Sequence, residues 1–255
     1  IEGSNSVPLA GQSCTLSFWV KSSVTGQYYV TFKIASARSY IAPYTISSAN
    51  TWEKKTITIT MDTLASLNTN GDTGNGAGFQ VYFGLRLGSS AQATSTVNQW
   101  VDGNFYGTLS QVTWGTNVSD TFYIGAVQLE LGTAASPFEH RSVGEELELC
   151  KRYFNQIGGQ TPYQNIIQAM WISGNTAVSP YYHRPALRAT PTIAKLQNYS
   201  SLGPGTIGQT LSTDQNGLNS VQFGFSGGSG GTSGISVVLR GNNNSGVYIT
   251  FDAEL

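Results

Sequence analysis

The 255-residue sequence predicts an all-β protein with two β-sandwich domains joined by a short α-helix. Apolar and polar residues alternate in many short segments, which is typical of strands with one buried face. Only 11% of the residues are charged and 30 are glycine, a composition that favours short strands joined by many turns. One segment in the middle of the chain has helical spacing instead.

Alternation predicts five half-buried antiparallel strands in the first half of the chain. In the first strand, Leu16 and Phe18 face the core, whereas Ser17 and Trp19 have the opposite parity. The five segments are 15–20, 28–34, 55–61, 79–87 and 121–131. In the last segment the inward parity changes near Gly125, and one extra residue in a β-bulge would explain the change.

A capping box marks the start of the predicted helix. The hydroxyl of Ser142 can accept from the amide of Glu145, whose carboxylate can reach back to the Ser142 amide. We therefore expect a helix from Val143 to about Tyr153, with Lys151 near its negative C-terminal end. Beyond the helix, alternation predicts further strands at 166–172, 177–182, 192–197, 220–225, 235–240 and 247–252.

Charge and hydropathy argue against nucleic-acid and membrane partners. The formal net charge is −1, and the 13 Lys and Arg residues form no basic stripe of the kind that phosphate binding requires. No apolar run approaches the roughly 18 residues of a membrane span, so no membrane insertion is expected. The chain begins at Ile1 without an initiator Met, and we expect residues of the first domain to precede it.

No motif predicts an enzyme, a cofactor or a metal site. Three carboxylates share the predicted helix, where helix capping accounts for the first of them: Glu145, Glu146 and Glu148. His140 and His183 lie outside any metalloprotease or Ser-His-Asp pattern. Cys14 and Cys150 form no CxxC pair, which argues against a zinc site and leaves a disulfide between them as an open alternative.

Three consecutive motifs resemble a junction found in bacteriophage and prophage tail-fibre proteins. They are IGAVQLELG at 124–132, SPFEHR at 136–141 and EELELCKRYF at 145–154. In that family, a carbohydrate-binding-module-like jelly roll ends in the first motif, a turn and a helix follow, and a fibre-tip domain comes after them. LAGQSCTLSFWVK at 9–21 is similar to an early strand of the jelly roll, and LRATPT at 187–192 is similar to a segment of the tip domain.

The resemblance implies a jelly roll at 1–141, a linker helix at 142–154 and a C-terminal β-sandwich tip or trimerisation domain at 155–255. It implies a homotrimer in the virion tail, in contact with other phage tail proteins. It also implies a non-catalytic role in host attachment, through binding of a host cell-surface glycan.

Aromatic residues are the candidates for contacts with such a glycan, because the C–H faces of sugar rings dock on flat rings while polar groups fix the hydroxyls. Four residues alternate with the core residues along the strands of the first domain, so they face away from the core: Trp19, Tyr29, Tyr82 and Arg86. We expect the face that they share to carry ligand or to pack on a neighbouring subunit.

Two further groups are candidates on composition alone. One lies before the last strand of the first domain and contains Trp100, Asp102, Asn104, Tyr106 and Trp114. The other is a candidate tip site in the second domain and contains Tyr163, Trp171, Tyr181, Tyr182 and His183. For both groups, packing in a core or a subunit contact is the alternative.

Two other functions remain open. The chain is alternatively a purely structural virion or decoration protein without a ligand. It is also compatible with an accessory carbohydrate-binding module of a polysaccharide-degrading enzyme, which a monomeric state would favour.

Overall fold

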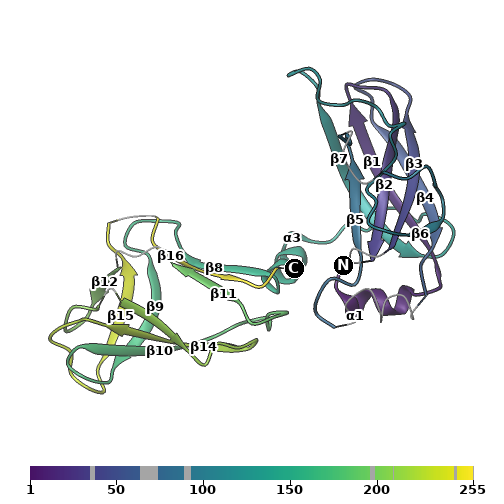
Figure 1. Cartoon of the computed structure of the whole chain (residues 1–255). Coiled ribbons are helices and arrows are strands. Elements are labelled where there is room, and N and C mark those ends of the chain that lie inside the picture. Colours follow the sequence, from purple (N-terminus) through teal and green to yellow (C-terminus); the bar gives the residue numbers. More distant parts are fainter. Residues whose placement is uncertain are drawn as a thin grey trace. The chain divides into compact units, whose positions relative to one another are not determined.

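The computed structural model describes residues 1–34, 38–63, 74–88, 93–195, 199–208, 210–243 and 246–254. Strands account for 48% of the chain and helices for 7%, so the all-β prediction is confirmed. The described chain divides into two compact units, Ile1–His140 and Arg141–Glu254, and each is described by itself (Figure 1).

The first sheet of unit 1 has the order β4-β1-β7. Its strands are β1 (Ser13–Ser22), β4 (Glu53–Thr60) and β7 (Phe122–Leu131), and β1 is antiparallel to both neighbours. Leu16 and Phe18 are buried as predicted, while Trp19 points away from the core and is 42% exposed.

The second sheet of unit 1 has the order β5-β2-β3-β6. Its strands are β2 (Gly26–Ile34), β3 (Arg38–Ile46), β5 (Gln80–Gly84) and β6 (Trp100–Asp102), as Figure 1 labels them. Strands β3 and β6 were not predicted. Consecutive residues of β3 are buried on both faces, which removes the alternation that identifies a half-buried strand.

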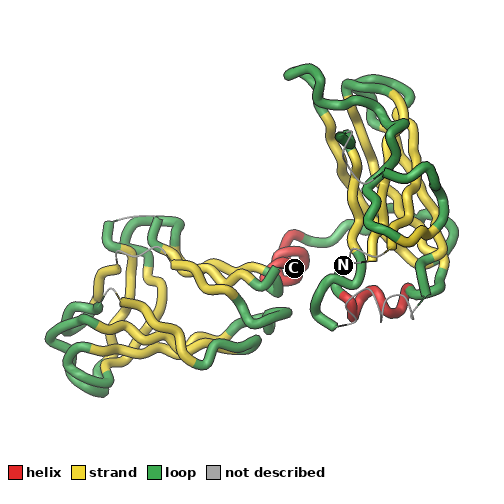
Figure 2. Tube along the Cα trace, in the orientation of Figure 1, coloured by secondary structure: helices red, strands yellow, loops and turns green. Residues whose placement is uncertain are grey.

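The two sheets of unit 1 enclose one apolar core. Phe18 of β1 makes edge-to-face contacts with Tyr44 of β3 and Phe83 of β5, at centroid distances of 5.2 and 5.1 Å. Edge-to-face geometry is favourable for aromatic pairs, so these rings join the sheets. The result is a two-sheet sandwich, with long loops between its strands (Figure 2).

The predicted β-bulge in β7 is confirmed. The register against β1 shifts between Ser17 and Trp19, and Ala126 has a positive φ of 47°. One extra residue in β7 therefore sits between the pairs Trp19–Gly125 and Ser17–Gln128. The bulge places Gly125 directly beside Trp19.

The predicted helix is present as α3 (Val143–Lys151), within unit 2. The amide of Glu145 donates to the Ser142 hydroxyl at 3.3 Å, and the Ser142 amide donates to the Glu145 carboxylate at 3.0 Å. The capping box is therefore confirmed. A short helix α1 (Gly3–Ser6) and a 3₁₀ turn η1 (Val7–Leu9) were not predicted.

Unit 2 contains a six-stranded sheet in the order β12-β15-β9-β10-β14-β13 and a three-stranded sheet in the order β11-β16-β8. The strands of the larger sheet are β9 (Asn165–Trp171), β10 (Thr176–Tyr182), β12 (Tyr199–Leu202), β13 (Thr210–Asp214), β14 (Ser220–Ser226) and β15 (Ser236–Gly241). Those of the smaller sheet are β8 (Phe154–Gly158), β11 (Thr192–Lys195) and β16 (Tyr248–Asp252). The strand predicted at 192–197 extends past Lys195 into residues 196 and 197, which lie outside the described residues.

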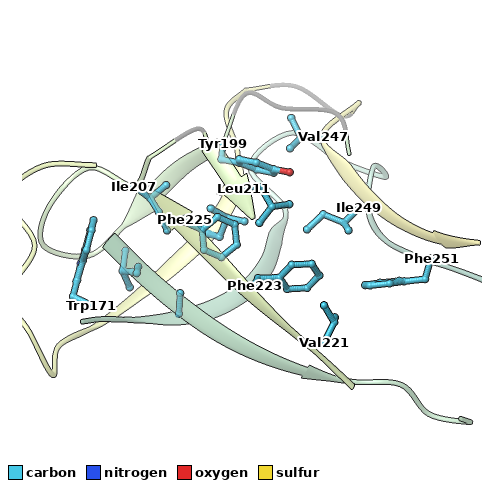
Figure 3. Close-up of a cluster of buried hydrophobic side chains, with 14 of the residues drawn as sticks. Trp171, Tyr199, Ile207, Leu211, Val221, Phe223, Phe225, Val247, Ile249 and Phe251 are labelled. Atoms are coloured by element: carbon cyan, nitrogen blue, oxygen red, sulfur yellow. The ribbon is translucent and has the colours of Figure 1, made fainter. Parts of the chain in front are cut away.

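Aromatic side chains form the core of unit 2. Phe223 and Phe225 of β14 lie in the same cluster as Ile249 and Phe251 of β16 (Figure 3). All four are fully buried, so they hold the two sheets together. Both cysteines are free thiols, with Cys14 buried in unit 1 and Cys150 exposed in unit 2, so the disulfide alternative does not apply.

Candidate functional site

A groove of about 550 Å³ opens at the β5 edge of the second sheet of unit 1. Its lining consists of Tyr82, Phe83, Gly84, Leu85, Arg86, Leu87, Tyr106, Trp114 and Gly115. Four of the candidate residues, Tyr82, Arg86, Tyr106 and Trp114, therefore meet in one place. A concave site of this size with aromatic walls and few polar groups suits a small ligand or a segment of a polymer.

Two tyrosine rings form one wall of the groove. Tyr82 projects from β5, and Tyr106 comes from the segment that follows β6. Their rings meet edge to face, with centroids 5.3 Å apart and planes at 88°. The hydroxyl of Thr31 on β2 donates to the Tyr106 carbonyl at 2.8 Å, which fixes the loop against the sheet.

A buried lysine supports these two rings. Lys33 of β2 is only 1% exposed, and its Nζ lies 3.9 Å from the Tyr106 centroid and 5.6 Å from the Tyr82 centroid. It also donates to the side-chain oxygen of Asn104. The hydrogen bond from Lys33 holds the pKa of Tyr106 below its usual value, whereas burial raises the pKa of Tyr82. The sequence alone does not distinguish Lys33 from an ordinary solvent-exposed lysine. Its position in β2, an even number of residues from Tyr29, places it only on the same strand face as Tyr29.

Trp114 and Arg86 complete the groove. The indole N–H of Trp114 donates to the Thr121 carbonyl at 3.4 Å, and the ring packs partly on the core. The Gln111 side-chain oxygen, oriented toward its donors, accepts from the amides of Arg86 and Leu87 at 2.8 and 2.9 Å. Arg86 itself is exposed and is the one charged residue among those described in the lining.

Tyr29 does not face a ligand or a neighbouring subunit, which corrects the prediction for this residue. It is 2% exposed, because residues 103–112 of the same chain cover the outer face of the sheet. The Tyr29 hydroxyl accepts from Thr108 at 2.6 Å and donates to Gln27 at 2.8 Å. Sequence parity identified the correct face of the strand but not the loop that covers it.

Trp100 and Asp102 lie on β6, at the opposite edge of the sheet from the groove. The indole N–H of Trp100 donates to the Thr60 carbonyl at 2.9 Å, and its ring meets Tyr40 edge to face at 5.6 Å. Asp102 pairs with Arg38 at 3.1 Å. Asn104 accepts from Lys33. The predicted group of loop residues is therefore divided, and its first three members make structural contacts.

The candidate tip site in unit 2 is divided as well. Trp171 is fully buried in the core, where its indole N–H donates to the Pro204 carbonyl at 3.0 Å. His183 is 4% exposed and packs on Tyr181 and Phe251. Tyr163 and Tyr182 are exposed. Trp171 and His183 are therefore core residues, which is the alternative considered for this group.

Within the described ranges, no group of three or more His, Cys, Asp or Glu side chains is arranged to hold a metal ion. No helix in the same ranges is long and apolar enough to cross a membrane. Hydrogen bonds from Ser142 hold the pKa of Glu145 below its usual value, which fits its capping role. Comparison of the chain with protein-family models, curated proteins and solved structures finds no match.

Proposed function

We propose that this protein is a non-catalytic component of a bacteriophage tail that attaches to a host by binding a surface polysaccharide in the β5-edge groove. The observation that carries the proposal is the meeting of Tyr82, Tyr106 and Trp114 with a single cation, Arg86, in one open groove. Flat rings suit the apolar faces of sugars, and Arg86 suits a hydroxyl or an acidic substituent.

Preorganisation also supports binding in the groove. Lys33 and Thr31 hold the Tyr106 wall before any ligand arrives, which reduces the conformational entropy that binding must overcome. A single groove of this kind gives weak affinity. Three copies in a homotrimer would raise the effective concentration and so the avidity at a cell surface. A trimer would have a mass of about 82 kDa in light scattering, against 27.2 kDa for one chain.

The competing function is a purely structural virion protein without a ligand. The internal contacts of Tyr29, Trp100 and Asn104 favour it, because these residues turn out to serve packing. Binding experiments separate the two functions directly.

The test is a titration of tryptophan fluorescence with a panel of purified bacterial capsular and O-antigen polysaccharides, since Trp114 lines the groove. We expect at least one polysaccharide to bind and Arg86→Ala to weaken it about tenfold, the effect of losing one charge-assisted hydrogen bond. Arg184→Ala, which removes an exposed arginine in unit 2, is the matched control. No binding across the panel would favour the structural function.

A further inference from the structure

A second aromatic surface lies on the outer face of the β4-β1-β7 sheet, away from the groove residues. We call it the Trp52 face, and it consists of Trp19, Lys21, Trp52, Lys54 and Tyr123. The side chains of Trp19, Trp52 and Tyr123 are 42%, 46% and 48% exposed, respectively. Three large rings on one sheet face need a reason, since apolar groups of this size normally contribute to a core or to binding.

The rings of the Trp52 face hold a cation between them. Lys21 of β1 is paired with Tyr123 of β7, and its Nζ lies 4.6 Å from the Tyr123 centroid and 5.4 Å from the Trp52 centroid. The two rings lie 6.4 Å apart and fix the ammonium group by cation–π attraction. Among the described residues, no carboxylate forms an ion pair with Lys21, whereas Lys54 is attracted electrostatically to Glu130 of β7.

Trp19 lies next to this cluster, and among the described residues no side chain covers its ring on the β7 side. Its cross-strand neighbours are Lys54 on β4 and Gly125 on β7. A Cβ added at Gly125 would meet no atom within 4 Å, and Gly125 does not have a positive φ. Neither packing nor backbone geometry requires glycine there, so its effect is to leave space beside the Trp19 ring.

The outer faces of the two sheets of unit 1 differ in how far other segments of the chain cover them. Residues 103–112 cover the outer face of the β5-β2-β3-β6 sheet. On the β4-β1-β7 sheet, the segment after β7 covers only the far end, where Thr15 donates to the Gly132 carbonyl at 2.8 Å. The rows that contain Trp19 and Lys21 stay open to solvent in unit 1.

We propose that the Trp52 face is a second binding site, for a saccharide that carries a carboxylate. Trp19, Trp52 and Tyr123 supply flat surfaces for sugar rings, and Lys21 supplies a positioned charge for the carboxylate. Two-fold packing of this face on a second copy is disfavoured, because it would bring Lys21 and Lys54 against the same lysines of the partner.

The test is calorimetric titration of the full chain with two acidic tetramers, of galacturonic acid and of α2,8-linked sialic acid, and with a galactose tetramer as the neutral match. At least one acidic tetramer is expected to bind tenfold or more tightly than the neutral one, and more weakly as salt is added. Trp52→Ala and Lys21→Gln should each lower its affinity at least fivefold. Gly125→Leu should block the site while leaving the thermal unfolding temperature unchanged.

Arg86→Ala separates this site from the groove, because it should leave the affinity for the acidic tetramer unchanged. A loss of that affinity in Arg86→Ala, with full affinity in Trp52→Ala and Gly125→Leu, would overturn the proposal and assign acidic sugars to the groove. Absence of binding by both acidic tetramers, or equal binding of the neutral one, would also overturn it. These last two results would leave polysaccharide binding in the groove untouched, because the Arg86→Ala titration with the polysaccharide panel tests it separately.

Discussion

The ammonium group of Lys33 lies 3.9 Å from the ring centroid of Tyr106, which forms part of the wall of the candidate groove. This pair joins a strand in the interior of a sheet to a loop on its outer face. The lysine is only 1% exposed, and the Tyr82 and Tyr106 rings and the Asn104 oxygen give its ammonium group favourable electrostatic contacts in place of water.

Replacing this lysine should change the titration of Tyr106. The hydrogen bond from Lys33 lowers the pKa of the Tyr106 hydroxyl, so Lys33→Met should raise that pKa toward its ordinary value. The measurement is phenolate absorbance against pH. Tyr106→Phe identifies which part of the curve belongs to this residue. An unchanged curve in Lys33→Met would mean that the pair does not act on the tyrosine.

The bulge in β7 stores backbone strain that a substitution can release. Ala126 has a φ of 47°, a region that costs an L-residue roughly 1 kcal/mol or more relative to glycine. We expect Ala126→Gly to raise the free energy of unfolding of unit 1 by about 1 kcal/mol, and Ala126→Val to lower it. Urea unfolding checks both, and the reverse order of the two variants would contradict the strain.

The capping box of α3 gives a local prediction in unit 2. Ser142→Ala removes the acceptor for the Glu145 amide and should cost about 0.5–2 kcal/mol of helix stability. Hydrogen exchange of the first-turn amides of α3 reports this directly, with faster exchange expected. Ser142→Asp is the control, since aspartate also caps helices and should retain the protection. Equal exchange in all three proteins would show that the cap contributes little.

The fold could be predicted from the sequence wherever one strand face is buried and the other is wet. Strand β4 is such a case, since its residues alternate in burial, and the parity change near Gly125 even located the bulge in β7. Strand β3 was missed because Tyr40, Ile41 and Ala42 are buried in succession. A run of consecutive apolar residues carries no period-2 signal.

The candidate site could be predicted only in part, because loops determine it. Parity placed Tyr82 on the outer face of the sheet, but it could not show that residues 103–112 bury Tyr29 on the same face. Trp100 and Trp114 are close in the sequence, yet one lies at the β6 edge and the other in the groove at the β5 edge. Long-range contacts of this kind leave no local pattern.

We expect the buried histidine of unit 2 to make the stability of that unit depend on pH. His183 is 4% exposed and packs against Phe251 at 4.7 Å and Tyr181 at 5.4 Å. Among the described residues, neither ring nitrogen has a hydrogen-bond partner. Burial lowers the pKa of His183 from its ordinary 6.5, because the apolar surroundings disfavour the charged imidazolium.

The sign of the effect follows from proton binding in the two states. Below about pH 6.5 the unfolded chain binds a proton at His183 that the folded chain does not, so stability falls as the pH is lowered through this range. We expect the unfolding temperature of unit 2 to drop between pH 7.5 and 5, and His183→Phe to reduce the drop. His140→Gln, at an exposed position, is the control and should leave the slope unchanged. If His183→Phe retains the full slope while His140→Gln removes it, the sensitivity belongs to the exposed histidine, and the apolar site around Phe251 does not control it.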